Sequence, residues 1–144
     1  MRAKVNMKIS EEKLKKKIIG DLKDKGLITI DLGSGTFDLL IDEGKRPLLE
    51  LKVANLNYKK WAKTKGIRFT EQQTQEIRKM RNLPIVFACD ENDIKTCYLI
   101  EPEELERLSK SKERRRKREI CVGIKYLEQI SYRKALDRLS NFIY

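Results

Sequence analysis

The stretch GTFDLLIDEGKRPLLELKVA, residues 35–54, contains two apolar runs joined by a short linker. Each run is typical of a buried strand, but each is interrupted by charge: Asp38 lies in the first, and Glu50 and Lys52 lie in the second. Burying two carboxylates and an amine among apolar residues is unfavourable unless they are paired or hold a metal ion. The stretch therefore predicts a functional site built on two neighbouring strands.

The side-chain period of a strand places these charges on one face. Residues two apart in a strand point the same way, so Glu50 and Lys52 share a face, and the apolar residues around them point to the other. If the strand with Asp38 pairs beside this one, the three charged groups converge at one edge of the sheet.

Length and charge limit the class of protein. The chain has 144 residues, 40% of them hydrophobic, which predicts one folded domain over residues 1–144. A formal net charge of +11 favours a polyanionic partner, either nucleic acid or an anionic membrane surface; the alternative is a solvated basic surface without a specific partner. No apolar run approaches the roughly 18 residues of a membrane span, and no signal peptide is recognisable, so we expect an intracellular protein without a membrane partner.

The absence of histidine limits the available chemistry. Without histidine, and without a C-x-x-C pair among Cys89, Cys97 and Cys121, the sequence has no ligand set for a zinc finger or a zinc deaminase site. Ser–His triads are excluded as well. Each cysteine lies in an apolar run and is expected to be a small buried residue. Any catalysis must therefore use carboxylates, lysines or metal-activated water.

Local signals divide the chain into helices and strands. Ser10 is a typical N-cap, and Thr70-x-x-Gln73 is a capping box that opens a second helix. The order predicts an α/β fold with a mixed central sheet flanked by helices. The predicted helices cover about 11–25, 70–81 and 102–108, with a last amphipathic helix that starts after Ser131. The predicted strands cover 27–30, 37–41, 48–53, 85–89, 95–100 and 120–124.

Two segments are rich in basic residues. Residues 55–68 interleave lysines with Tyr58 and Trp61, which suits contact with a nucleic-acid strand; the alternative is a loop whose aromatic residues anchor it to the core. Residues 109–118 form a charge run that is either a solvated loop, a helix extension or a phosphate-contacting patch. The candidate DNA-binding residues are Lys59, Lys60, Lys63, Lys65, Arg68, Arg114, Arg115 and Arg116.

The charges of residues 35–54 suit phosphodiester hydrolysis. The carboxylates of Asp38 and Glu50 are hard oxygen ligands for Mg²⁺ or Mn²⁺, and the backbone carbonyl of Leu51 is a candidate third ligand. A bound cation would activate water and neutralise the phosphate. Lys52 would orient the water or stabilise the pentavalent phosphorus.

The motif GTFD at residues 35–38, followed by ELK at residues 50–52, resembles the PD-(D/E)XK nuclease superfamily, which has the restriction-endonuclease-like fold. Phe37 stands where the motif has proline. The resemblance covers roughly residues 9–100 and implies an αβββαβ core, in which a crossover helix follows three strands.

The resemblance also implies roles outside the motif. Many members have a glutamine at the start of the crossover helix, which implies an active-site role for Gln73; capping alone is the other interpretation. A glutamate of the first helix, Glu11 or Glu12, would complete the metal site, unless both are simple first-turn acids. Asp31 is a further candidate ligand, although a turn role is the simpler interpretation.

The implied activity is that of a Mg²⁺- or Mn²⁺-dependent DNA endonuclease acting as a homodimer, with the final helix and Trp61 as candidates for the interface. Small size and the Gly-Ser-Gly turn before Asp38 look like the archaeal Holliday junction resolvases, which cut four-way DNA. Small restriction-type, viral or mobile-element nucleases remain alternatives, as does an RNA substrate. The alternative from another class is a basic DNA-binding protein on the same fold, without catalysis.

Overall fold

The computed structural model describes residues 8–33, 35–111 and 114–143. In the larger, six-stranded sheet the strands are β1 (Thr29–Asp31), β2 (Leu39–Ile41), β3 (Leu48–Ala54), β5 (Ile85–Asp90), β6 (Asp93–Ile100) and β8 (Gln129–Ser131). They lie side by side in that order. The pair β3–β5 is parallel and the other neighbours are antiparallel. A separate two-stranded sheet contains β4 (Gly66–Arg68) and β7 (Cys121–Gly123).

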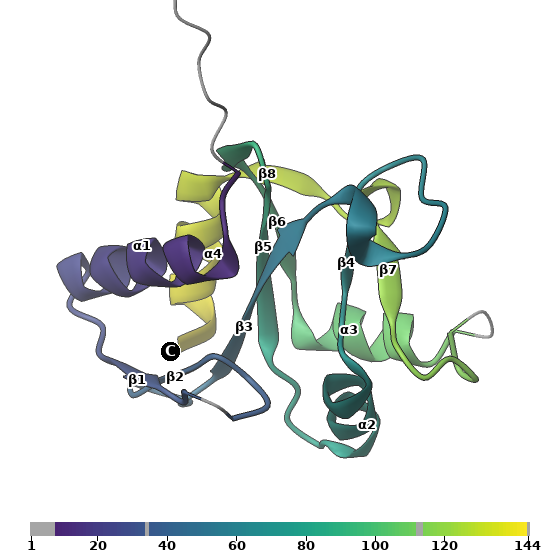
Figure 1. The fold of residues 1–144 in the computed structure, drawn as a ribbon. Coiled ribbons are helices and arrows are strands. Elements are labelled where there is room, and N and C mark those ends of the chain that lie inside the picture. The colour runs from purple at the N-terminus through teal and green to yellow at the C-terminus, as the bar shows by residue number, and fades with distance from the viewer. Residues whose placement is uncertain (1–7, 34, 112–113, 144) are drawn as a thin grey trace, which may run out of the picture.

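Helices cover both faces of the larger sheet (Figure 1). They are α1 (Glu11–Asp24), α2 (Glu71–Lys79), α3 (Pro102–Ser109) and α4 (Tyr132–Ile143), with short 3₁₀ turns η1 (Leu56–Tyr58) and η2 (Ile124–Tyr126). α1 and α4 lie against one face, whereas α2, α3 and the β4–β7 pair lie against the other (Figure 1). The prediction of an α/β fold with a mixed sheet flanked by helices is confirmed.

The first helix follows its sequence signals. The Ser10 side chain caps the first turn, and Leu14, Ile18 and Leu22 form a single apolar stripe that is fully buried. After the helix, Gly26 has a φ of 80°, a left-handed conformation that glycine adopts without strain. α1 is therefore fixed at both ends and along one face.

The second helix connects the parallel strands β3 and β5. Its predicted capping box is present: the Thr70 hydroxyl accepts from the Gln73 amide, and the Gln73 side chain accepts from the Thr70 amide. The helix ends at Lys79, two residues before the predicted boundary, where Met80 turns to an extended backbone. The crossover brings the start of α2 to the face of β3 that carries the charged residues.

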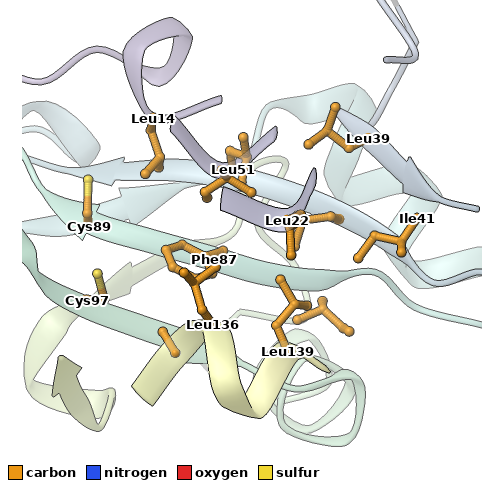
Figure 2. Close-up of a cluster of buried hydrophobic side chains, with 14 of the residues drawn as sticks. Leu14, Leu22, Leu39, Ile41, Leu51, Phe87, Cys89, Cys97, Leu136 and Leu139 are labelled. Atoms are coloured by element: carbon orange, nitrogen blue, oxygen red, sulfur yellow. The ribbon is translucent and has the colours of Figure 1, made fainter. Parts of the chain in front are cut away.

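Two apolar clusters pack against opposite faces of the sheet. The first lies between the sheet and α1 and α4, and includes Leu51, Phe87 and Leu136 (Figure 2). The second lies between the sheet and α2 and α3, and includes Phe69 and Val86. The strand period was predicted correctly, because Leu51 faces the first cluster while its charged neighbours face the second. The predicted burial of Cys89 and Cys97 is also confirmed, and Cys121 is half-buried.

The strand boundaries differ from the prediction in specific places. β2 starts at Leu39 rather than at residue 37, because Asp38 bonds to β3 through its side chain instead of its backbone. The predicted strand 120–124 becomes β7 and pairs with β4, outside the larger sheet. β8 is an edge strand that the sequence did not indicate. These pairings join distant segments, so no local pattern specifies them.

The apolar face of the final helix packs into the core of the chain. Ala135, Leu136 and Leu139 are buried in the first cluster, where α4 covers β5 and β6. Its apolar stripe therefore belongs to the core of the chain itself. None of the described helices has both the length and the apolar character that a membrane crossing requires.

The contact between Gly66 and Tyr58 provides a test of the packing around β4. A Cβ at Gly66 would lie 2.5–2.6 Å from three atoms of the buried Tyr58 ring. Gly66→Ala is therefore expected to lower the free energy of unfolding by about 1–3 kcal/mol, measured by urea denaturation. The matched control is Gly20→Ala in α1, where a Cβ would meet nothing within 4 Å; we expect it to stabilise the helix by about 0.5–1 kcal/mol. Equal effects of the two substitutions would contradict the packing.

Candidate active site

Asp38 lies where β2 and β3 separate. The ladder between these strands pairs Leu39 with Leu49 and Leu40 with Leu48. Beyond that ladder, the Leu51 amide donates a hydrogen bond to Asp38 Oδ2 at 2.8 Å, so the carboxylate replaces a strand carbonyl. Because the N–H and C=O of one residue in an extended strand point to the same side, the Leu51 carbonyl is directed toward this same edge.

Glu50, Lys52 and Gln73 form a buried hydrogen-bonded network on the adjacent face. Lys52 Nζ lies 3.3 Å from Glu50 Oε2 and donates to Gln73 Oε1 at 2.8 Å. Gln73 Nε2 donates to the same Glu50 oxygen at 2.5 Å. The side chains of Glu50 and Lys52 are only 2% and 6% exposed. A buried ion pair needs further hydrogen bonds to offset its desolvation, and Gln73 provides a donor to one partner and an acceptor to the other.

The side chain of Gln73 combines the two roles that the sequence left as alternatives. Its Oε1 accepts from the Thr70 amide at 3.1 Å as part of the capping box, and also accepts from Lys52. Its Nε2 donates to the Thr36 carbonyl at 3.0 Å as well as to Glu50. Four hydrogen bonds therefore fix the side-chain amide of Gln73, and they hold the start of α2 against the charged face of β3.

The carboxyl group of Glu50 gives the clearest indication that the site binds a ligand. Its second oxygen, Oε1, is buried and has no hydrogen-bond partner among the described residues. Burial is the main cause that raises the pKa of Glu50 to about 8; the neighbouring Asp38 carboxylate adds to it, and the charge of Lys52 opposes it. The buried site therefore favours the protonated form of Glu50 more than water does, and a bound cation would oppose this.

The acidic residues of the first helix are placed differently from one another. The pKa of Glu11 is raised, chiefly by loss of water around the carboxylate, and the charges of both Lys52 and Asp38 act on it. Both glutamates are exposed, but Glu11 is within electrostatic range of the site, whereas the charge of Glu12 acts on Lys15. Asp31 has the turn role: it accepts from the Gly33 amide and forms a 2.7 Å ion pair with Lys15.

The two carboxylates of the site could hold a divalent cation of the Mg²⁺ type only together with backbone oxygens and water. Across residues 8–33, 35–111 and 114–143, no three His, Cys, Asp or Glu side chains are grouped to hold a metal ion. The candidate ligands are therefore the carboxylates of Asp38 and Glu50 with the Leu51 carbonyl, a small oxygen set that suits a cation which keeps several waters. The unpartnered Glu50 oxygen supports this fit. A ligand role for Glu11 stays a prediction.

The first basic segment presents most of its lysines to solvent. Lys59, Lys60 and Lys63 are exposed in the loop between β3 and β4. Lys65 is instead committed to the protein, because its ammonium pairs with Asp90 at 3.0 Å and with Glu91 at 3.8 Å. Among the predicted phosphate contacts, Lys65 therefore has a structural role.

The second basic segment precedes β7, whose pairing with β4 places it near Arg68, at the other end of β4 from the loop that carries Lys59 and Lys63. Arg115 and Arg116 are exposed, but the guanidinium of Arg114 bonds the Cys121 carbonyl at 3.1 Å and packs on the Tyr126 ring. Arg68 is exposed and lies 3.9 Å from Glu119. Residues 112–113 of the predicted charge run lie outside the described residues. The two segments thus lie at opposite ends of the β4–β7 pair, and Arg114 is a packing residue.

Two residues of the site were missed from the sequence. Phe69 lies beneath the Lys52 ammonium, with its ring centre 5.0 Å away, and Thr36 accepts from both Gln73 and Gln72. Thr36 precedes Asp38 by two positions, and Phe69 precedes the capping Thr70 by one. Their closeness to motif residues was the available signal, but only the tertiary structure brings them to Lys52 and Gln73.

Comparison with known proteins gave no match: no protein-family model, no curated protein and no solved structure matches the chain.

The raised pKa of Glu50 predicts a pH-dependent difference between the wild type and Glu50→Gln in metal-free buffer. Between pH 4.5 and about 8, the folded chain holds a proton that an unfolded glutamate has released, so wild-type stability falls as pH rises. The amide variant lacks this effect. Its stability relative to the wild type should rise across that window by at most about 1.4 kcal/mol per pH unit, and level off above it.

Urea denaturation at several pH values measures this difference. The substitution Glu103→Gln, at an exposed carboxylate of α3, is the control for loss of a surface charge. A difference between wild type and Glu50→Gln that stays constant from pH 4.5 to about 8 would show that Glu50 ionises normally.

Proposed function

We propose that the protein is a metal-dependent DNA endonuclease that hydrolyses phosphodiester bonds. One observation carries the proposal: Glu50 is buried beside Asp38 and in contact with Lys52, and one of its oxygens has no partner in the part of the chain that the structure describes. Two carboxylates and a lysine at the open edge of a strand are the set that metal-assisted phosphate hydrolysis needs. The net charge of +11 supports a polyanionic substrate.

The arrangement of elements supports a PD-(D/E)XK type of nuclease within this proposal. α1 is followed by the meander β1–β2–β3, then by the crossover helix α2 and the parallel strand β5. This is the αβββαβ order that the motif resemblance implies. Asp38 directly precedes β2, and Glu50 and Lys52 lie on β3, which supports assigning them to the acidic and basic positions of the motif.

Each side chain of the site has a distinct part in the proposed reaction. Asp38, Glu50 and the Leu51 carbonyl would hold Mg²⁺ or Mn²⁺, and the bound cation would activate water and neutralise charge on the phosphate. Lys52, fixed by Gln73 and Phe69, is held ready to donate a hydrogen bond to a phosphate oxygen on which negative charge builds. Gln73 acts through its neighbours, because its amide positions both Glu50 and Lys52.

The proposal includes a substrate and an assembly. The basic region around the loop between β3 and β4 would contact the DNA backbone, and the similarity to Holliday junction resolvases favours a homodimer that acts on branched DNA. A comparison of cleavage on several substrates distinguishes branched-DNA specificity from restriction-type cleavage and from an RNA substrate. The substrates are four-way, flapped, single-stranded and linear duplex DNA, and an RNA of the same sequence.

The first test is cleavage of these substrates in Mg²⁺ and in Mn²⁺. Asp38→Ala, Glu50→Ala and Lys52→Ala are each expected to lower the cleavage rate by at least about a hundredfold, because each removes a group that stabilises the transition state. Lys134→Ala is the matched control: Lys134 is an exposed lysine of α4, which covers the opposite face of the sheet, and its loss should leave the rate unchanged.

Two outcomes would overturn the proposal. Full cleavage by all three variants would place the chemistry elsewhere. Salt-sensitive DNA binding without metal-dependent products on any substrate would favour the non-catalytic alternative, a basic DNA-binding protein.

The second test is the effect of the cation on thermal stability. Mn²⁺ at about a hundred times its Kd should stabilise the wild type by about 2.7 kcal/mol, seen as a rise in Tm. The effect should increase as pH rises through about 8, because Glu50 must lose its proton to bind the cation. Asp38→Asn should abolish most of the rise. Asp31→Asn, which removes a nearby carboxylate that pairs with Lys15, should keep it; the reverse pattern would refute the ligand assignment.

A further inference from the structure

The loop between β3 and β4 holds its tryptophan out in solvent. Trp61 is 88% exposed, more than any other large apolar residue described, and its φ of 62° is left-handed. A bulky residue seldom adopts this conformation, and an indole seldom lies free of protein contacts. Together, the exposure and the strained backbone indicate a residue that contacts a binding partner instead of packing in the core.

The base of this loop is rigid. Asn55 and Gly66 exchange two backbone hydrogen bonds of 3.0 Å, and the Tyr58 ring fills the space above Gly66. The Cys121 thiol donates to the Tyr58 carbonyl at 3.2 Å, and Lys65 pairs with Asp90 at 3.0 Å. The tip at residues 59–64 therefore projects from a fixed platform, beyond the edge of the sheet (Figure 1).

The surroundings of Trp61 are cationic. The exposed lysines Lys59, Lys60 and Lys63 lie within two residues of it in the loop. An aromatic ring flanked by cations is suited to a nucleic acid, because lysines contact phosphates while the ring stacks on a base. In an intact duplex the bases are already stacked on one another, so an indole can stack only on a base that is unpaired or at a kinked step.

The loop is also connected to the proposed site. β3 carries Glu50 and ends at Ala54, about 13 Å further along the strand at about 3.3 Å per residue, and the loop starts there. That distance corresponds to about four nucleotides of one DNA strand at 3.4 Å each. The loop therefore starts about four nucleotides of one DNA strand away from Glu50, which places its tip to meet bases away from the cut rather than at it.

We propose that Trp61 stacks on an unpaired base of the bound DNA, so that the protein prefers DNA with unpaired bases a few nucleotides from the cut. This inference rests on the proposed function for its DNA partner and goes beyond it in naming the feature of the DNA that is recognised. Lys59, Lys60 and Lys63 hold the flanking phosphates, and the indole discriminates between stacked and unstacked bases.

The chain has a single tryptophan, so its fluorescence reports on this residue alone. The experiment uses the full chain in EDTA, which prevents metal-dependent cleavage, and two fluorescein-labelled DNAs: a fully paired duplex and the same duplex with a bulge of unpaired nucleotides. Anisotropy of the label measures binding, and tryptophan emission measures stacking. We expect the bulged DNA to quench Trp61 strongly and the paired duplex to quench it weakly.

Substitutions make the assignment specific. Trp61→Gly suits the left-handed backbone, so the fold should be retained; it should weaken binding of the bulged DNA about tenfold and of the paired duplex less than about twofold. Trp61→Phe should have an intermediate effect. Ile28→Ala removes another exposed apolar side chain, next to β1, and should change neither affinity.

The outcomes separate this inference from the proposed function. Binding of bulged DNA without quenching, or equal losses of affinity for both DNAs in Trp61→Gly, would overturn it even if the protein cleaves DNA. A blue-shifted emission with phosphatidylglycerol vesicles and no response to DNA would overturn it in favour of a membrane contact. Quenching by bulged DNA without cleavage in Mg²⁺ would support it and count against the proposed function.

Discussion

The burial of Glu50 beside Lys52 is the constraint on which the rest of the site depends. Removing both charges from water is unfavourable unless their remaining hydrogen-bonding atoms are satisfied. Gln73 satisfies Lys52 and one oxygen of Glu50, and Phe69 lies beneath the ammonium. The other Glu50 oxygen stays without a partner among the described residues, and nearby Asp38 raises the pKa of Glu50 further. Such an arrangement is destabilising in isolation and favours a cation, which is why we connect it to function rather than to folding.

The same constraint explains how the elements are ordered around β3. The strand must be central for its residues to be buried, so β2 and β5 flank it on either side. β2 pairs with only the first part of β3, which leaves the edge near Leu51 to the Asp38 side chain. The parallel crossover then returns the chain through α2, whose capping residue Gln73 faces the charged side of the strand. A short β2 and a capped α2 are thus both requirements of the site.

The segment between Glu50 and Gln73 contains both residues of the proposed active site and the loop proposed to recognise DNA. It leaves the sheet at Ala54, forms the loop with Trp61, returns as β4 and reaches Phe69 beneath Lys52. The pairing of β4 with β7 places the second basic segment near Arg68, at the other end of β4 from this loop. The hydrogen-bonded base of the loop, where Asn55 pairs with Gly66, lies between the loop tip and the buried network.

The sequence alone determined the capped helices, the central strands and the shared face of Glu50 and Lys52. Helix caps and the side-chain period of a strand depend on residues only a few positions apart, so they can be recognised in the sequence. It also identified Asp38, whose charge stood out in an apolar run. Only the tertiary structure decided that β7 pairs with β4, that Lys65 and Arg114 are used within the protein, and that Gln73 bridges Glu50 and Lys52. Those contacts join residues more than twenty positions apart or depend on which neighbour a flexible cation meets, and no local pattern encodes that choice.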